Sequence, residues 1–144
     1  MDARYRLSSD PTDIDRARVH RWLSDDSYWA TGRSRERQDA AIDGSRCFVA
    51  LEAETGEQVA FARVVTDGAT FAWLCDVYVD REHRGAGVGT ALMEFVVREL
   101  EALDLRRWVL RTGDAHGLYE RFGFTEPEQP ETWMARELPG GGTR

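Results

Sequence analysis

The chain has 144 residues, which suits one globular domain and leaves little room for a second. Its net charge of −7 excludes the basic surface that general nucleic-acid binding needs, and no apolar run approaches the roughly 20 residues of a membrane span. Hydrophobic residues make up 42% and charged residues 31%, which excludes disordered and collagen-like classes. We therefore expect a single cytoplasmic domain over residues 1–138, followed by a flexible, glycine-rich tail at 139–144.

Residue usage narrows the possible chemistry. Cys47 and Cys75 both lie in apolar, strand-like runs and are typical of small buried hydrophobic residues in a reducing compartment. The three histidines are too few and too scattered to predict a metal site. All 19 basic residues are arginine, which excludes covalent catalysis by a lysine amine.

The first half of the chain predicts one short strand and two helices. The strand is expected at 5–8, and helical spacing of apolar residues continues to about residue 23. A second helix is expected at 34–42, ended by Asp43-Gly44. The turn-like segment between the two helices carries the aromatic residues Tyr28 and Trp29.

Strand patterns then dominate the sequence. Apolar runs at 46–53, 58–66 and 70–79 are separated by Thr55-Gly56 and Asp67-Gly68, which predicts an antiparallel meander. The later elements expected are a helix at 87–103, a strand at 107–111, a helix at 115–122 and a last strand at 132–138. This order indicates an α/β fold with a mixed, largely antiparallel sheet and flanking helices in three layers.

The segment Arg84-Gly-Ala-Gly-Val-Gly89 joins a predicted strand to an amphipathic helix. Its glycines allow close approach of a ligand to main-chain N–H groups, and the helix adds its positive dipole end. Arg81 and Arg84 supply cations, so the segment predicts a cradle for a diphosphate. The alternative is a tight turn in which glycine merely permits packing. A Walker loop is excluded because lysine is absent, and the dinucleotide fingerprint because the spacing is Gly-x-Gly-x-Gly.

Two motifs give the chain a specific resemblance. Arg84-x-x-Gly87-x-Gly89, preceded by Val77-x-Val79, resembles motif A of the GNAT acetyltransferases. Ala115-x-x-Leu118-Tyr-Glu-Arg-Phe-Gly-Phe124 resembles motif B of the same family. The distance between them fits one helix and one strand.

The resemblance implies the acyl-CoA N-acyltransferase fold, with a sheet splayed between its fourth and fifth strands. Acetyl-CoA would lie in this gap as the co-substrate, without a metal. Main-chain groups of the fourth strand would pair with the pantetheine arm, and the glycine segment would hold the pyrophosphate. Thr112 stands where the family often has asparagine. The implied cofactor-binding residues are Val77, Tyr78, Val79, Arg84, Gly85, Ala86, Gly87, Val88, Gly89, Thr90 and Thr112.

The resemblance also implies that Tyr119 lies near the thioester sulfur. A phenol with a pKa of about 10 is protonated at neutral pH and can donate to a departing thiolate. The N–H of Val77 is a candidate donor to the oxyanion. Direct attack by the acceptor needs no enzyme nucleophile. The alternative is that Tyr119 is a core aromatic residue.

Several residues are candidates for the acceptor side. Asp76 is a second candidate catalytic residue, as a base or amine anchor; the alternative is that it faces away and pairs with an arginine. Tyr28 and Trp29 are candidate pocket walls, or they pack against the core. Arg63 and Trp73 are candidate substrate-binding residues, with an open-face position and core packing as their respective alternatives.

The sequence thus predicts an N-acetyltransferase that moves an acetyl group from acetyl-CoA to a primary amine by direct attack in a ternary complex. The expected acceptor is a small molecule or peptide, with no nucleic-acid or membrane partner, and the expected state is a monomer or homodimer. The alternative function is a non-catalytic acyl-CoA-binding or sensor domain on the same fold.

Overall fold

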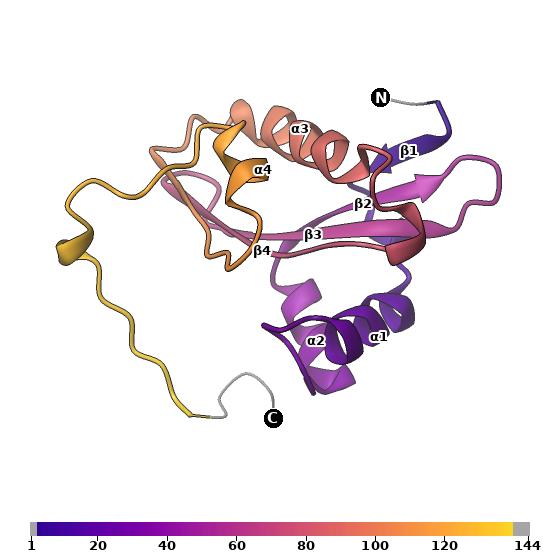
Figure 1. Cartoon of the computed structure of the whole chain (residues 1–144), viewed down its shortest axis with the longest axis horizontal. Helices are drawn as coiled ribbons and strands as arrows, with labels where there is room; N and C mark the ends of the chain where they lie inside the picture. Colours follow the sequence, from indigo (N-terminus) through magenta and orange to yellow (C-terminus); the bar gives the residue numbers. More distant parts are fainter. Residues whose placement is uncertain (1–2, 140–144) are drawn as a thin grey trace.

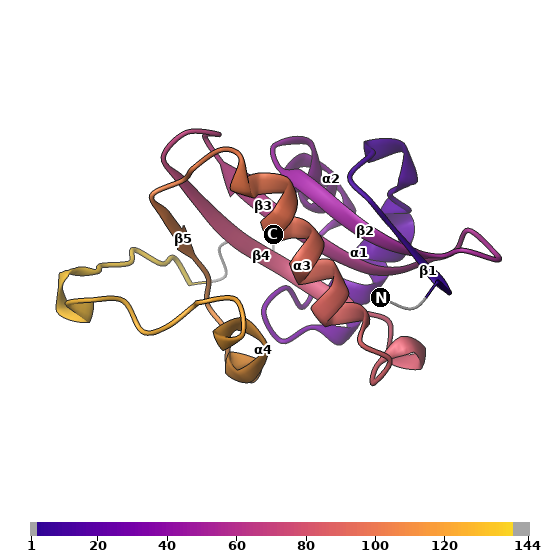
Figure 2. The same ribbon diagram turned by 90° about the horizontal axis from the view of Figure 1, so that it is seen from above.

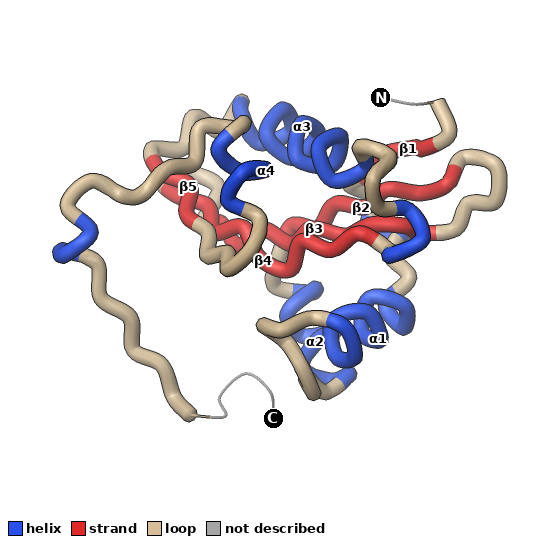
Figure 3. Tube along the Cα trace, viewed as in Figure 1, coloured by secondary structure: helices blue, strands red, loops and turns tan. Residues whose placement is uncertain are grey.

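The computed structural model describes residues 3–139; the predicted tail lies outside the described residues from residue 140 onward. Figures 1 and 3 show how the strands and helices follow one another along this part of the chain. The strands are β1 (Tyr5–Ser8), β2 (Arg46–Glu52), β3 (Gln58–Thr66), β4 (Phe71–Val79) and β5 (Arg107–Val109). The helices are α1 (Arg16–Asp26), α2 (Arg35–Asp43), α3 (Val88–Glu101) and α4 (His116–Glu120), with short 3-10 helices η1 (Pro11–Asp13), η2 (Arg81–His83) and η3 (Pro130–Thr132).

The strands form one mixed sheet in the order β1-β2-β3-β4-β5. The first four strands pair antiparallel with their neighbours, and among them β2, β3 and β4 form the meander that the hairpin signals predict. β5 pairs parallel with β4, and only over Phe71–Trp73 and Arg107–Val109. The mixed, largely antiparallel sheet is therefore confirmed. Beyond Trp73 the edge of β4 that faces β5 has no strand partner in the described structure.

Helices cover both faces of the sheet, which confirms the predicted three layers. α3 packs on one face, and α1 and α2 pack on the other (Figures 1 and 2). Each face has its own apolar core. Leu92, Val96 and Leu74 belong to the core under α3, whereas Leu23 and Phe61 belong to the core under α1 and α2.

A β-bulge interrupts β4 at its centre. Arg63 of β3 is paired with Cys75, but Phe61 is paired with Tyr78, so β4 contains one extra residue between these pairs. Asp76 has a φ of 48°, a left-handed conformation that aspartate adopts more readily than most residues. Before the bulge the even-numbered residues of β4 face α3, and after it the odd-numbered residues do. Tyr78 therefore joins the core under α1 and α2.

The predicted strand at 132–138 is wrong. In its place the chain forms η3 and then runs exposed and without regular structure. The preceding segment explains the departure from the sheet: Pro127 and Pro130 cannot donate a ladder hydrogen bond, and Gln129 has a φ of 51°. In Figure 1 this segment projects away from the body of the protein.

A search of the described residues for a helix long and apolar enough to cross a membrane finds none.

Candidate active site

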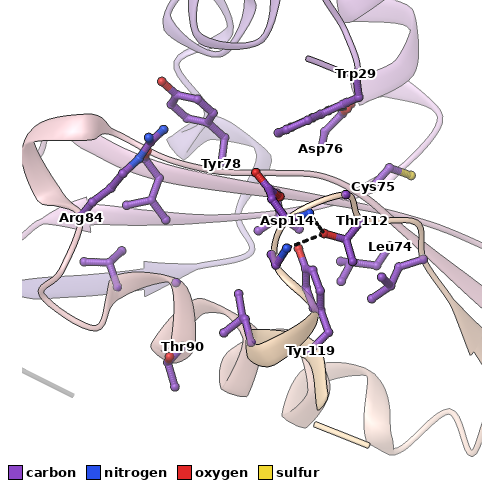
Figure 4. A pocket seen from close by; sticks show the side chains of 18 of the residues that line it. Trp29, Leu74, Cys75, Asp76, Tyr78, Arg84, Thr90, Thr112, Asp114 and Tyr119 are labelled. Carbon is purple, nitrogen blue, oxygen red and sulfur yellow. Dashed lines mark hydrogen bonds between the residues drawn. The ribbon is translucent and has the colours of Figure 1, made fainter. Parts of the chain in front are cut away.

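A cavity of about 1340 Å³ lies where β4 and β5 separate (Figure 4). Its walls come from the second half of β4, the turn that leads into α3, the loop between α1 and α2, and the segment from Leu110 to Arg121. The cavity thus occupies the gap in the sheet that the motifs predict.

One end of the cavity is formed by main chain at the start of α3. Gly85 and Gly87 both have a φ of 81°, a conformation that residues with a side chain rarely adopt. The first helical hydrogen bond runs from the Ala91 N–H to the Gly87 carbonyl at 3.0 Å. The amides at the start of the helix therefore lack partners within it, and they lie beside the cavity together with the dipole end. This is suitable geometry for an anionic phosphate group.

Two arginines stand at this glycine end, and both contact Asp26 of α1. Arg81 donates from Nε to the Asp26 carboxylate at 2.7 Å, and Arg84 Nη2 lies 3.7 Å from it. Tyr78 also donates its hydroxyl to Asp26 at 2.5 Å. The Arg81 and Tyr78 hydrogen bonds hold the pKa of Asp26 well below its ordinary value. The cations are therefore pre-positioned by a carboxylate that the sequence analysis did not single out.

Arg84 is also fixed to the end of β4. Its Nε donates to the carbonyl oxygen of Val79 at 2.9 Å, and its guanidinium lies 5.1 Å from the centre of the Tyr78 ring. The Val79 carbonyl, a predicted partner for a pantetheine amide, is thus engaged with Arg84 in this structure.

Tyr119 stands at the other end of the cavity, on α4. The residue is buried, and Figure 4 shows its hydroxyl directed toward the cavity. Burial raises the pKa of Tyr119 to about 12, and the nearby Tyr28 and Asp114 act in the same direction. The phenol is therefore a protonated donor throughout the neutral range.

Thr112 holds the start of α4 in place. Its Oγ1 accepts hydrogen bonds from the N–H groups of Ala115 at 2.9 Å and Asp114 at 3.4 Å (Figure 4). The hydroxyl thus caps the helix that carries Tyr119, and its acceptor capacity is used in that role.

Asp76 projects to the α1/α2 side of the sheet and is surrounded by donors. Its Oδ2 accepts from Arg33 Nη1 at 2.8 Å and from Arg63 Nε at 2.7 Å, and its Oδ1 accepts from Trp29 Nε1 at 2.8 Å. Burial alone would raise the pKa of Asp76, but the charges of Arg63 and Arg33 lower it below its ordinary value. This arrangement corresponds to the alternative in which Asp76 pairs with arginine, and it disfavours a proton-accepting role.

The loop between α1 and α2 closes the cavity beside Asp76. The Tyr28 hydroxyl accepts from the Gly113 N–H at 2.7 Å and so links this loop to the segment before α4. The rings of Tyr28 and Trp29 pack edge to face with centroids 5.0 Å apart. Trp73 lines the same cavity and is exposed. Aromatic surface therefore borders the entrance near Tyr119.

The cavity brings together nearly all the predicted site residues. Those that line it are Tyr28, Trp29, Trp73, Asp76, Val77, Tyr78, Val79, Arg84, Gly85, Gly87, Val88, Gly89, Thr90, Thr112 and Tyr119. Ala86 is exposed and does not line the cavity, and Arg63 lies behind it, bound to Asp76 and to the Ser45 hydroxyl.

Sequence reasoning missed Asp26, Arg33 and Asp114. Asp26 and Asp114 line the cavity, and Arg33 binds Asp76. The position of Asp114 directly before the second motif was an available signal. For Asp26 and Arg33 no local signal exists, because their roles depend on contacts with residues about 40 or more positions away. Among residues 3–139 no group of three histidine, cysteine or acidic side chains is arranged to hold a metal.

Comparison with known proteins decides the family. Residues 43–126, which contain both motifs, match the model of the acetyltransferase (GNAT) domain. The chain belongs to the GNAT acetyltransferase family. A candidate acetyltransferase of Gibberella zeae is 30% identical over 133 residues, covering 80% of this chain and 75% of the relative.

Solved structures agree with this GNAT assignment. A candidate GNAT acetyltransferase from Xanthomonas campestris pv. campestris is 45% identical, with a TM-score of 0.90 over 97% of both chains. The ribosomal-protein-S18-alanine N-acetyltransferase of Escherichia coli is 25% identical, with a TM-score of 0.67 over 85% of this chain and 79% of the other. A Mycobacterium tuberculosis protein solved in complex with CoA shares the fold at 18% identity, with a TM-score of 0.71 over 85% and 72% of the two chains.

Proposed function

We propose that this GNAT protein is an N-acetyltransferase that moves the acetyl group of acetyl-CoA to a primary amine by direct attack. The observation that carries the proposal is a single cavity with unpartnered helix amides at one end and the protonated hydroxyl of Tyr119 at the other. The first feature suits a pyrophosphate, and the second suits a departing thiolate.

The residues of the cavity fit acetyl-CoA. The amides of Val88, Gly89 and Thr90 and the left-handed glycines of the preceding turn would hold the pyrophosphate, with Arg81 and Arg84 beside them. Within residues 3–139 the edge of β4 that faces β5 has no strand partner beyond Trp73, so its main chain is available to amide groups of the pantetheine arm. Arg84 would release the Val79 carbonyl as its guanidinium turns toward a phosphate.

The chemical step needs two donors, an N–H group of the main chain and a side-chain hydroxyl. The amine nitrogen forms a bond to the thioester carbon, and the negative charge that develops on oxygen is stabilised by the Val77 N–H. The bulge supports this role, because neither Asp76 nor Val77 has a paired residue on β3. The C–S bond then breaks, and Tyr119 gives its proton to sulfur. The proton lost by nitrogen passes to water, which reprotonates Tyr119.

The acceptor is proposed to be a cationic amine. Asp114 lines the cavity and its charge acts on Tyr119, so a carboxylate stands close to the reacting end. Trp29 and Trp73 add aromatic faces that attract cations. These three side chains would recognise an ammonium group before it loses its proton.

Asp76 is proposed to be a positioning residue rather than a base. Its carboxylate joins the Trp29 and Arg33 side chains of the acceptor loop to the bulge of β4. It would thereby fix the distance between the acceptor wall and the Val77 N–H.

Substitution of Tyr119 by phenylalanine tests the proposal. We expect turnover to fall by about 10²- to 10⁴-fold, because one general acid is lost, while the dissociation constant of CoA is unchanged. The readouts are release of free CoA thiol from acetyl-CoA against a panel of amines, and calorimetry with CoA. Tyr5→Phe on β1 is the matched control and should retain turnover. Equal loss of CoA binding and turnover in Tyr119→Phe would show a structural tyrosine.

The same assay separates the alternative of a non-catalytic sensor. A sensor would bind acetyl-CoA, and so raise its own melting temperature, without releasing thiol in the presence of any amine. ATP serves as the reference nucleotide: an equal rise in melting temperature with ATP would contradict recognition of the pantetheine arm.

A further inference from the structure

Four large apolar side chains of the sheet belong to neither of the two cores of the described structure. Two of them are Phe71 and Trp73 of β4, which lie before the bulge and on the face that is turned away from α3. The other two are Val65 of β3 and Val109 of β5. Both are paired with Trp73, so they lie beside it on the same face. We call these four residues the apolar band.

The apolar band is not covered by the helices that pack on its face of the sheet. The core under α1 and α2 takes Phe61 from β3 and, from β4, Tyr78, which follows the bulge. Figure 2 shows the two helices on the side of the sheet away from β5. Phe71 and Trp73 consequently remain 38% and 46% exposed. Contiguous apolar side chains that stay exposed mark a surface that binds another molecule.

The apolar band continues the wall of the active-site cavity. Cys75 and Trp73 line the cavity, and Phe71 is the next residue of β4 on the same face. Alternate residues of a strand lie about 7 Å apart, so the exposed surface extends that far beyond Trp73. A molecule with its reacting group near Tyr119 can therefore lie against Trp73 and then Phe71 as it leaves the cavity. The occupant that this continuity selects is the acceptor.

Charge distinguishes the apolar band from the interior of the cavity. Asp114 lines the cavity, and its charge acts on Tyr119. Along the band, no acidic residue is paired across the described sheet with Phe71 or Trp73, whose partners are Val65, Val109 and Arg107. Arg107, the partner of Phe71, is exposed and carries a positive charge. The site thus offers a carboxylate to one ammonium group, and apolar surface with a cation at its edge to the rest of the acceptor.

We infer that the acceptor is a primary monoamine whose apolar body, several carbons long, lies over Trp73 and Phe71. The inference rests on the proposed acetyl transfer and names the class of acceptor for it. Asp114 and Trp29 hold the ammonium group, and the apolar band removes the body from water. Polyamines do not match this site, because a second ammonium group would lose hydration on the band and meet the guanidinium of Arg107.

The first test compares heptylamine with 1,6-diaminohexane as acceptors, with release of free CoA thiol as the readout. The two molecules have the same length and differ in whether a methyl or an ammonium group ends the chain. We expect kcat/KM to be at least about 10-fold higher for heptylamine. Ethylamine is too short to reach Phe71 and measures transfer itself. Heptylamine should exceed ethylamine by at least about 10-fold, because its additional methylene groups are buried on the band.

The second test reverses the charge preference with Phe71→Glu. The added carboxylate should attract the second ammonium group and repel the apolar chain. The ratio of kcat/KM for heptylamine to that for 1,6-diaminohexane should therefore fall by at least about 10-fold. A ratio measured within one variant does not depend on the fraction of folded protein or on its affinity for CoA. Ala53→Glu, on the exposed turn between β2 and β3, adds the same charge elsewhere and should keep the wild-type ratio.

The outcomes separate this inference from the proposed function. Equal kcat/KM values for heptylamine and ethylamine would overturn the inference and leave acetyl transfer in place. A wild-type preference for 1,6-diaminohexane would do the same, as would an unchanged ratio in Phe71→Glu, which is the result expected if another protein molecule covers the band. If none of these three amines releases thiol but another amine does, the inference is overturned and the proposed function stands. If no amine does, both are overturned.

Discussion

At the glycine end of the cavity the main chain supplies the contacts, whereas at the Tyr119 end they come from side chains of three separate segments. The amides at the start of α3 are positioned by the conformation of one continuous turn. Tyr119, Trp29 and Asp76 come from α4, the loop after α1, and β4. The first end therefore depends on local backbone geometry, and the second depends on long-range packing. Variants at the two ends should fail in different ways.

The largest effect is expected at the side-chain end, from Asp76→Ala. The Asp76 side chain is 1% exposed, and its partners Arg33 and Arg63 are 13% and 14% exposed. Removing the carboxylate would leave two buried guanidinium groups without their counter-charge. We expect the free energy of unfolding to fall by about 3–5 kcal/mol, measured by urea denaturation.

Asp43→Asn provides the control for this prediction. Asp43 also binds an arginine, Arg16, but its side chain is 67% exposed. Its loss should change the free energy of unfolding by no more than about 0.5 kcal/mol. Equal effects of the two substitutions would show that the Asp76 cluster is not a buried network.

At the main-chain end, Gly87→Ala should have the next largest effect. An added Cβ meets no neighbouring atom, but the φ of 81° is strained for alanine. The expected strain is about 1–3 kcal/mol. Either the free energy of unfolding falls by this amount, or the turn changes its conformation and binds CoA more weakly. Gly117→Ala, in α4, also meets no neighbour and needs no left-handed conformation, so it should be neutral or slightly stabilising. CoA binding that is unchanged in Gly87→Ala would contradict the role of the turn.

A smaller effect is expected where the two walls of the cavity are joined. Tyr28→Phe removes the hydroxyl that accepts the Gly113 N–H, and water can replace it because Tyr28 is 61% exposed. We expect the free energy of unfolding to fall by about 0.5–1 kcal/mol, and hydrogen exchange at the Gly113 amide to become faster. Unaltered exchange at Gly113 would indicate that the link contributes nothing to closing the cavity.

The smallest effect is on the pH dependence of stability, and it appears only in alkaline solution. Burial raises the pKa of Tyr119 to about 12, above the ordinary value of about 10. Its contribution to stability is therefore complete below pH 10 and is lost as the pH rises toward 12. A titration of tyrosinate absorbance should show a late component near pH 12 that Tyr119→Phe reduces. If the substitution leaves that component unchanged, the hydroxyl is not shielded from water.

The difference between the two ends also explains what could be predicted from the sequence. The hairpins, the three-layer order and the glycine turn could be predicted from the spacing of apolar residues and from short motifs, and the structure confirms the fold. The partners of Asp76 could not be predicted, because Arg33 and Trp29 reach it only after the sheet and the α1–α2 loop have packed together. The segment at 132–138 has a strand-like pattern, but Pro127 and Pro130 carry it away from the sheet, so propensity alone misled.

The bulge in β4 shifts by one residue the alternation of side chains between the two faces of the sheet. Before it, Ala72 and Leu74 face α3; after it, Val77 and Val79 do. Deleting a single residue at 76–77 would remove the bulge and let both halves of β4 keep their partners on β3, so Tyr78 would stay opposite Phe61 in the α1/α2 layer and keep its contact with Asp26. The inserted residue therefore serves the reacting end of the cavity alone: shortening β4 here would return the main chain at Val77 to the ladder with β3 and leave the contacts among Tyr78, Asp26 and Arg81 in place.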